Sequence, residues 1–371
     1  MGQAPEGETY NNEGVGLPLI AGAGDFGPVH PSPKKFTSAP TKICDPGDIV
    51  VGIRASIGEK VVADRTYCLG RGVAGLRSKS SLNSRYLWHW LTHMAPVLVA
   101  KAKGATFLQV NREDIASLQM ELPTLPEQLR IAAILDHADA LRAKRGAALA
   151  QLDTLTQSIF LDMFGDPVTN DRDWRDDAKL GDVAEIASGV TKGRRLNGKP
   201  TRAVPYLAVA NVQDRALRLK EVKTIDATEA EIARYRLHDN DLLLTEGGDP
   251  DKLGRGSLWT GQIPECIHQN HIFRVRITSP DIDPVFLNWL IGSKRGKRYF
   301  LRSAKQTTGI ASINMTQLRG FPILMPPVDR QRLFADQVRA VTSLSMLQTV
   351  AASELDTLFA SLQHRAFRGE L

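Results

Sequence analysis

The sequence predicts an α+β protein of two similar domains, each followed by a long helix, in which the two helices pair as an antiparallel coiled coil. Residues 126–168 and 328–371 both carry apolar side chains at the three- and four-residue spacing of an amphipathic helix. Helices of this length are typical of coiled coils. The segments before the two helices also resemble each other when Gln128 is aligned with Gln331. A repeat of this length indicates a duplicated domain rather than a short repeating unit.

The positive charge of the chain is concentrated in the segments before the helices. The 371 residues carry a net charge of +6 and are enough for two or three domains. Residues 1–125 hold 13 basic and 11 acidic side chains, and residues 169–327 hold 25 and 19. The two helical segments have no positive excess. This distribution indicates a polyanionic ligand for the globular parts and protein contacts for the helices.

The chain lacks the sequence features of a membrane or secreted protein. No apolar run is long enough to span a bilayer, and the first residues are polar, unlike a signal peptide. Cys44, Cys68 and Cys266 lack the spacing of a metal or redox motif. We therefore expect a cytoplasmic protein without disulfides.

The first domain is expected to span residues 1–125 and to be rich in strands. The segment 24–46 holds several prolines and is expected to be a loop. The apolar patterns predict strands at 17–21, 48–54, 60–63 and 118–122 and a helix at 83–100.

The first long helix and its turn are expected to span residues 126–168. Pro126 suits the first turn of a helix, and the acidic Glu127 favours the same end. Gly165 and Pro167 are expected to end it. The predicted apolar face includes Ile131, Leu135, Leu141, Leu152, Leu155 and Ile159.

The second domain is expected to span residues 169–327, and the second helix residues 328–371. Strands are predicted at 204–209, 241–245 and 272–277, and a helix at 284–302. About 20 residues that begin at Trp174 have no counterpart in the first half, so the first domain is expected to be shortened at its N-terminus. The predicted apolar face of the second helix includes Phe334, Val338, Val341, Leu344, Leu347, Leu355, Leu358 and Leu362.

The order of these segments resembles that in the DNA-specificity (S) subunits of type I restriction–modification systems. The resemblance covers nearly the whole chain. It is carried by the segments LPTLPEQ (122–128), FLDMFGDP (160–167) and the Trp174…Leu180-Gly-Asp182…Ser188-Gly189 pattern. It implies that residues 1–125 and 169–327 are target-recognition domains, each reading one half of a split DNA site. It also implies that the helices set the distance between the halves.

The same resemblance implies a set of partners and no catalytic role for this chain. The partners would be double-stranded DNA, two methyltransferase subunits and, in some systems, restriction (motor and nuclease) subunits, with no membrane. S-adenosylmethionine is expected on the methyltransferase subunits, so no cofactor and no enzymatic activity are expected here.

Possible catalytic or metal-binding patterns are weak in this sequence. The GxGxxG pattern at residues 22–27 is followed by prolines instead of the helix that a nucleotide loop needs. The pair His89 and His93 has helical metal spacing but no accompanying Glu or Cys in a known arrangement, and His268 with His271 is similar. Residues 249–252 contain two carboxylates and a lysine in a glycine-rich loop. We expect none of these groups to be catalytic or to bind a metal.

The candidate DNA-binding residues follow from basic and amide-rich segments. Residues 292–306 hold six basic residues and no acid, and four of them fall on one helical stripe: Lys294, Arg298, Arg302 and Lys305. Leu290, Phe300 and Leu301 are expected to face the core. Lysine and arginine bind phosphates, whereas amides and hydroxyls can read base edges. The remaining candidates are Lys192, Arg194, Arg195, Asn211, Gln213, Gln306, Thr307, Thr308 and Ser312 in the second domain, and Lys101, Lys103, Thr106, Gln109 and Asn111 in the first.

Two alternatives belong to other functional classes. An autonomous fused nuclease–methyltransferase would bind S-adenosylmethionine as an isolated chain. A coiled-coil adaptor that binds no DNA would show no salt-dependent affinity for a duplex.

Overall fold

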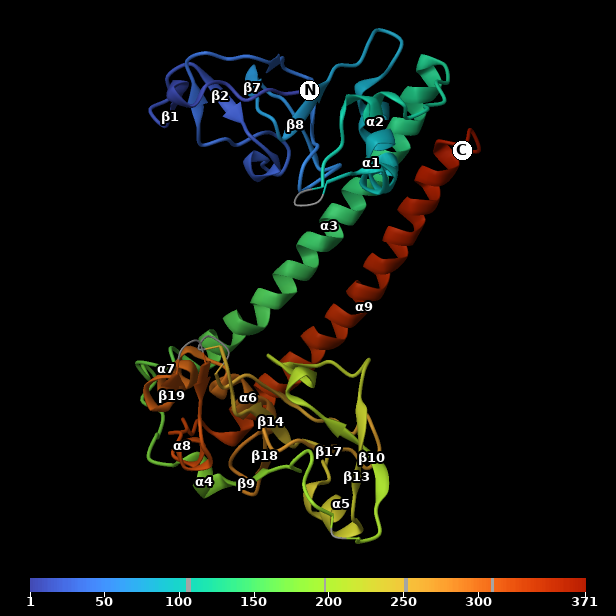
Figure 1. Ribbon diagram of the computed structural model, residues 1–371. Helices are drawn as coiled ribbons and strands as arrows, with labels where there is room; N and C mark the ends of the chain where they lie inside the picture. Colours follow the sequence, from blue (N-terminus) through green and yellow to red (C-terminus); the bar gives the residue numbers. More distant parts are fainter. Residues whose placement is uncertain (105–107, 197, 250–252, 308–309) are drawn as a thin grey trace. The chain divides into compact units, whose positions relative to one another are not determined.

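The computed structural model describes residues 1–104, 108–196, 198–249, 253–307 and 310–371 (Figure 1). The chain divides into two compact units, the first made of Met1–Ala148 with Gln348–Leu371 and the second of Leu149–Leu347. Each unit holds one globular part and a portion of both long helices. Within the described residues, no helix is long and apolar enough to cross a membrane.

The described residues of the globular part of the first unit form two small sheets and the helices α1 and α2. One sheet has the order β1-β3-β2-β7-β4 and the other β6-β5-β8. The bounds are β1 Tyr10–Asn11, β2 Leu17–Ile20, β3 Phe36–Thr37, β4 Ile43–Cys44, β5 Ile49–Gly52, β6 Lys60–Val62, β7 Tyr67–Leu69, β8 Val73–Leu76, α1 Ser84–Lys101 and α2 Arg112–Ala116, with 3-10 turns η1 Gly7–Thr9 and η2 Ala23–Asp25.

The first unit is held together by the packing of α1 on the second sheet. The Asn83 side chain caps α1 by accepting hydrogen bonds from the amides of Arg85 and Tyr86. Leu87 and Trp90 then pack against Ile49 and Val51 of β5, and all four side chains are buried. The predicted helix at 83–100 is confirmed, as are the strands in 17–21, 48–54 and 60–63.

The second unit has four small sheets. Their orders are β16-β14-β18-β9, β13-β10-β17, β11-β12 and β15-β20-β19. The strand bounds are β9 Ala184–Ser188, β10 Arg202–Leu207, β11 Val212–Gln213, β12 Ala216–Leu217, β13 Lys223–Ala227, β14 Leu242–Thr245, β15 Gly247–Gly248, β16 Gly256–Leu258, β17 Ile267–His268, β18 Ile272–Ile277, β19 Lys305–Thr307 and β20 Ile310–Ser312. The helices are α4 Leu180–Val183, α5 Glu229–Tyr235, α6 Pro284–Ile291, α7 Lys294–Ser303 and α8 Met315–Arg319, with the 3-10 turn η3 Val209–Asn211.

The two long helices are α3, Leu125–Phe164, and α9, Val328–Ala366. In the first unit, Ile131 and Leu135 near the start of α3 pack with Phe359 near the end of α9. In the second unit, Phe160 and Phe164 at the end of α3 lie 5.5 and 5.4 Å, between ring centroids, from a phenylalanine near the start of α9, Phe334. The start of each helix therefore packs on the end of the other, which confirms the predicted antiparallel pair.

A buried glutamine joins each long helix to the globular part before it. The Gln128 amide donates to the carbonyls of Ser81 and Pro123 at 3.0 and 2.9 Å, and its oxygen accepts from the Asn83 amide at 2.7 Å. Asn83 is also the residue that caps α1. This arrangement fixes the start of α3 against the start of α1.

Gln331 makes the same three hydrogen bonds at the start of α9. Its amide donates to the carbonyls of Asp281 and Pro326 at 2.9 and 2.8 Å, and its oxygen accepts from the Asp283 amide at 2.9 Å. Asp283 caps α6 as Asn83 caps α1. The repeat proposed from the alignment of Gln128 with Gln331 is therefore a structural repeat.

Four sequence predictions about the fold are wrong. The segment 24–46, expected to be a loop, contains the short strands β3 and β4. Residues 118–122 form no strand. The segment 284–302 forms two helices, α6 and α7, instead of one. Several side chains predicted for the helical seam are exposed, because two paired helices cover only a narrow stripe of each other; these are Leu141, Leu155, Leu344, Leu347 and Leu358.

We expect Gln331→Ala to lower the free energy of unfolding by about 1–3 kcal/mol, because it removes a buried side chain whose loss leaves three backbone groups without this partner. Chemical denaturation of the full chain measures this decrease. Gln337→Ala is the matched control, since Gln337 is an exposed glutamine on the same helix. Equal stability of the two variants would contradict a structural role for Gln331.

Candidate nucleic-acid interface

Helix α7 begins where a glycine allows the chain to fold back on α6. The Ser293 hydroxyl caps α7 by accepting from the Arg295 amide at 3.2 Å. A Cβ atom on Gly296 would lie 1.8 Å from the carbonyl oxygen of Ile291, the last residue of α6. Only a glycine permits this approach, which explains why the predicted single helix is broken.

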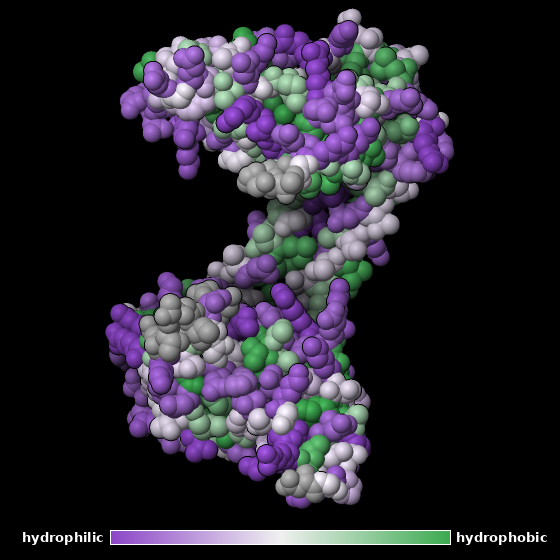
Figure 2. Space-filling model, in the orientation of Figure 1, coloured by the Kyte–Doolittle hydropathy of each residue, from purple (hydrophilic) through white to green (hydrophobic). Residues whose placement is uncertain are grey.

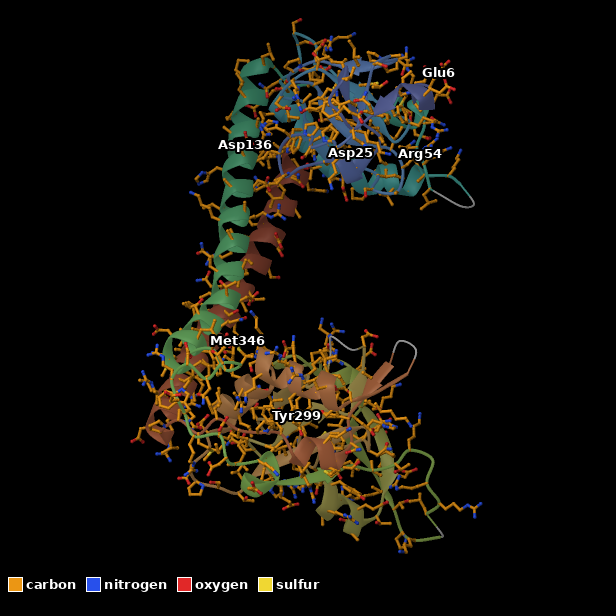
Figure 3. The ribbon with its side chains drawn as sticks, turned by 90° about the vertical axis from the view of Figure 1, so that its left-hand side faces the viewer. Glu6, Asp25, Arg54, Asp136, Tyr299 and Met346 are labelled. Carbon is orange, nitrogen blue, oxygen red and sulfur yellow. The ribbon has the colours of Figure 1, made fainter. Side chains whose placement is uncertain are left out.

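Three basic residues on α7, Lys294, Arg298 and Arg302, are exposed and follow one another at four-residue spacing. We call them the basic stripe. Phe300 is fully buried on the opposite side of α7 and anchors the helix in the core of the second unit. Tyr299, labelled in Figure 3, donates to the carbonyl of Gln317 in α8 at 2.9 Å. The stripe is therefore carried by a helix that is fixed on two sides.

The charges of the basic stripe are not neutralised by acidic neighbours in the described parts of the chain, where none of the three residues has an ion pair. Arg295, from the same basic run, differs. Its side chain is 13% exposed and donates to the carbonyls of Pro322 and Pro167, both at 3.2 Å. Arg295 is thus structural, whereas the stripe is free to bind phosphates.

The structure corrects the predicted surroundings of the stripe. Lys305 opens strand β19, so it does not continue the helical stripe, although its side chain is exposed. Leu301 is 38% exposed and does not face the core, whereas Leu290 and Phe300 do. Helix α7 ends at Ser303, so the helical spacing that predicted the position of Lys305 no longer applies there.

The segment after α7 is a hairpin of β19 and β20. Lys305 and Gly247 both pair with Ser312 in this three-stranded sheet. Gln306 and Thr307 lie in β19, but their side chains and the whole of Thr308 lie outside the described residues. A short hairpin that follows a basic helix can present side chains to a groove of DNA.

Arg194 makes a structural ion pair. Its Nε and Nη2 atoms donate to the two carboxylate oxygens of Glu231 at 2.5 and 2.7 Å. Glu231 in turn forms a capping box with Thr228 at the start of α5. Lys192 and Arg195, in the same loop, are exposed and remain candidates for phosphate contacts.

The amide candidates Asn211 and Gln213 are also held by the fold. Asn211 is buried, and its amide donates to the carbonyls of Arg218 and Glu221 at 2.7 and 3.1 Å. The Gln213 amide donates to the carbonyl of Ala210 at 2.8 Å. Asn211 is therefore positioned to stabilise a loop and not to read a base.

The candidates of the first unit lie near the end of α1. Lys103 and Gln109 form a two-residue bridge through their backbones, and both side chains are exposed. Lys101 donates to the Ser117 hydroxyl at 3.3 Å, and Asn111 caps α2. Thr106 lies outside the described residues.

Arg215 was missed by the sequence reasoning and lies beside the start of α7. Its guanidinium stacks 3.8 Å from the centre of the Trp289 ring, and its Nε has no hydrogen-bond partner among the described residues. Arg215, Lys294 and Lys297 line one pocket of about 560 Å³ with Trp289 and Phe160. The run at 292–306 could have indicated Lys297, but no sequence pattern marks Arg215.

The histidines serve the fold. His89 is buried on α1, and its Nε2 lies 2.7 Å from a carboxylate oxygen of Asp136 on α3 (Figure 3). Burial lowers the pKa of His268 to about 4, which keeps that ring neutral. Across the described ranges there is no cluster of three or more potential metal-binding side chains. Of residues 249–252, only Asp249 is described.

Comparisons with known proteins agree with this arrangement. Residues 19–151 match the family described as type I restriction modification DNA specificity domain. A Methanocaldococcus jannaschii protein, provisionally named as the type I restriction enzyme MjaX specificity subunit, is 35% identical over 142 residues, which are 38% of this chain and 33% of that protein. The StySPI specificity subunit of Salmonella potsdam is 23% identical over 91% of this chain and 78% of its own length. The EcoKI subunit of Escherichia coli is 24% identical, also over 91% and 78%.

Solved structures share the fold. The S subunit of a type I restriction–modification system from M. genitalium superposes with a TM-score of 0.55 at 16% identity and covers 99% of this chain and 92% of its own. A chain from a study of type I complex assembly and conformational transition gives 0.59 at 18% identity over 92% and 87%.

The fold and the candidate site therefore define a two-unit α+β protein with an exposed basic helix. The sequence of the chain is similar to those of specificity subunits of type I restriction–modification systems.

The ion pair of Arg194 and Glu231 predicts a pH-dependent contribution to stability. Hydrogen bonds from Arg194 lower the pKa of Glu231 from 4.5 to about 2. Because the folded pKa lies below the unfolded value, the pair contributes fully above about pH 4.5 and its contribution disappears as the pH falls toward 2. We expect Glu231→Gln to be less stable than the parent chain at pH 7 and to approach it near pH 2, as measured by denaturation at each pH. A difference that is constant from pH 7 to pH 2 would contradict the assignment.

Proposed function

We propose that this protein is the sequence-specific DNA-binding subunit of a type I restriction–modification complex. In this proposal the two globular parts are target-recognition domains that read the two halves of a split site. The proposal rests on the basic stripe, which is exposed and lies on a helix that Phe300 anchors in the core. It also rests on the relatives of the chain, which are named as specificity subunits.

The stripe and the hairpin divide the work of binding. The ammonium group of Lys294 and the guanidinium groups of Arg298 and Arg302 contact DNA phosphates. These contacts set the affinity for DNA and the orientation of the protein on the duplex. The β19–β20 hairpin directly follows α7. In this proposal Gln306, Thr307 and Thr308 are the candidates for contacts with base edges. Lys101, Lys103 and Gln109 have the corresponding task in the first unit.

The long helices offer a surface for protein partners. Met346, Leu347 and Val350 on α9 are 64%, 69% and 59% exposed. Figure 2 shows hydrophobic patches on the surface of the helical pair, and Figure 3 labels Met346 there. Large exposed apolar side chains in a group are typical of a protein interface. We propose that two methyltransferase subunits dock on the helices, with restriction subunits joining through them.

In this proposal the catalytic activities belong to the partner subunits. The chain itself has no catalytic role, S-adenosylmethionine binds the methyltransferase subunits, and the complex acts in the cytoplasm. The fused nuclease–methyltransferase and the adaptor that binds no DNA are both disfavoured by the relatives, which are named as specificity subunits.

The basic stripe is expected to bind phosphates without choosing a sequence. Arg298→Ala with Arg302→Ala should weaken binding to all duplexes about equally. The slope of log affinity against log salt should flatten by about 0.9 for each phosphate that the variant no longer neutralises. Arg339→Ala is the control, because Arg339 is an exposed helical arginine paired with Asp336 at 2.6 Å. An unchanged salt slope in the double variant would place the DNA surface elsewhere.

Specificity is expected to be bipartite. Replacing Gln306 and Thr307 should relax one half of the methylated sequence and spare the other half and the spacing. Inserting four residues, about one helical turn of roughly 5.4 Å, at Gly146 should change the spacing and spare both half-sequences. Gly146 suits this insertion because a side chain there would contact nothing within 4 Å. Mapping of methylated sites in cells that carry each variant and the methyltransferase partner tests both outcomes, and a continuous native site would exclude the two-domain arrangement.

A further inference from the structure

Three segments of the first unit meet just after the end of α1. The backbone of Gln109 forms antiparallel bridges with Arg54 on one side and with Lys103 on the other. The bridge to Lys103 has two hydrogen bonds, in which each amide donates to the carbonyl of the other residue, at 3.0 and 2.9 Å. On the other side, the Val110 amide donates to the Ile53 carbonyl at 3.0 Å. Arg54, Gln109 and Lys103 therefore lie in one row across three chain segments.

The side chains of this row share one face of the small array. Residues directly opposite each other in an antiparallel pair project to the same side, and Arg54, Gln109 and Lys103 are all exposed. Successive residues project to opposite sides, and the neighbours Ile53 and Val110 are both buried in one apolar cluster. We call Arg54, Gln109 and Lys103 the polar row.

The second unit contains the same array. Ser312 of β20 pairs with Gly247 of β15 on one side and with Lys305 of β19 on the other. The Ile313 amide donates to the Glu246 carbonyl at 2.9 Å, which repeats the hydrogen bond beside the polar row. The array is therefore part of the structural repeat, and the position held by a glycine in β15 is held by an arginine in the first unit.

The helices that precede the two arrays differ in charge. Each helix is capped at its C-terminus by the residue just before the lysine of its array. Counted back from that cap, the positions of the basic stripe on α7 correspond to Thr92, Pro96 and Ala100 on α1. The same count matches the buried Phe300 with the buried Leu98, which supports the alignment. Because the three α1 residues are uncharged, α1 carries no equivalent of the basic stripe.

The positive charge of Arg54 is not neutralised by the fold (Figure 3). Among the described residues, neither Arg54 nor Lys103 has an ion pair, although acidic side chains occur in adjoining segments at Asp25 and Glu59. Other arginines of the first unit are paired: Arg77 binds Asp48, and Arg85 binds Asp136. The polar row therefore places two exposed cations on either side of an exposed amide.

We propose that Arg54 and Lys103 hold the DNA backbone for the first unit and so replace the basic stripe that its helix lacks. This inference rests on the proposed function and adds Arg54 to the residues through which the first unit binds phosphates. Guanidinium and ammonium groups bind phosphate oxygens, whereas the neutral amide between them can contact a base edge.

The spacing of the polar row suits two separate phosphate contacts. Neighbouring strands lie about 4.8 Å apart, so the two outer strands of the array lie about 10 Å apart. One DNA strand presents a phosphate about every 3.4 Å along the helix axis, so this span covers about three phosphates. Arg54 and Lys103 thus contact different phosphates, and their effects on binding are expected to add.

The test measures binding of the full-length chain to labelled duplexes of two unrelated sequences by fluorescence anisotropy at several salt concentrations. Arg54→Ala should weaken binding to both duplexes about equally. It should also flatten the slope of log affinity against log salt by about 0.9, and the further change Lys103→Ala should flatten it by about as much again. Arg54→Lys should keep the parent slope, because an ammonium group also binds a phosphate.

Gln109→Ala is the matched control, since Gln109 is exposed on the same face but carries no charge, and it should leave the slope unchanged. Denaturation should give the parent stability for Arg54→Ala, because the side chain is exposed and has no ion pair among the described residues. An unchanged salt slope in Arg54→Ala, or a slope flattened equally by Arg54→Lys, would overturn the inference. Weakened binding to one duplex only would also overturn it, because it would indicate a base contact.

The same measurement separates this inference from the proposed function. If the parent chain showed no salt-dependent binding to a duplex, the proposed function would fail and the inference with it. If the Arg298→Ala and Arg302→Ala double variant flattened the slope while Arg54→Ala did not, only the inference would fail.

Discussion

The architecture depends on one buried side chain at the start of each long helix. Gln128 and Gln331 each satisfy three backbone groups and are 1% and 0% exposed. A buried amide with all of its partners is stable, but the removal of one partner is costly. Each glutamine bonds the residue that caps the adjoining domain helix, Asn83 or Asp283. The direction in which each long helix leaves its globular part is therefore set by hydrogen bonds rather than by apolar contact alone.

An apolar cluster in each unit stabilises the antiparallel pairing of α3 and α9. The aromatic cluster of Phe160, Phe164 and Phe334 closes the second unit around the end of α3 and the start of α9. In the first unit Phe359 packs with Ile131 and Leu135. Between these clusters, side chains of α9 such as Leu347 are exposed.

Basic residues in this protein divide into two groups that charge alone does not distinguish. Arg295 and Arg194 are partly buried and bonded to carbonyls or to a carboxylate. Arg298 and Arg302, a few residues from Arg295, are exposed and lack acidic neighbours among the described residues. The difference arises from the contacts around each side chain and not from helical spacing, because Arg295 lies only three positions before Arg298. The carbonyls of Pro322 and Pro167 bind the Arg295 guanidinium at 3.2 Å, whereas Arg298 and Arg302 are exposed. Only the exposed face can exchange counterions for DNA phosphates.

The sequence by itself determined the two long helices, their pairing, the duplication and most central strands, because these depend on periodic apolar patterns and on short motifs that act locally. The repeated Gln128 and Gln331 even fixed the alignment of the two halves. Only the tertiary structure shows which polar side chains are already hydrogen-bonded within the fold and which are exposed. The backbone carbonyls of Arg218 and Glu221 accept hydrogen bonds from the Asn211 amide, and the Glu231 carboxylate accepts one from Arg194. No sequence pattern indicates these contacts. The strand predicted at 118–122 is absent for a related reason, since a strand forms only where a neighbouring backbone completes its hydrogen bonds, and among the described residues no backbone group pairs with residues 119–122.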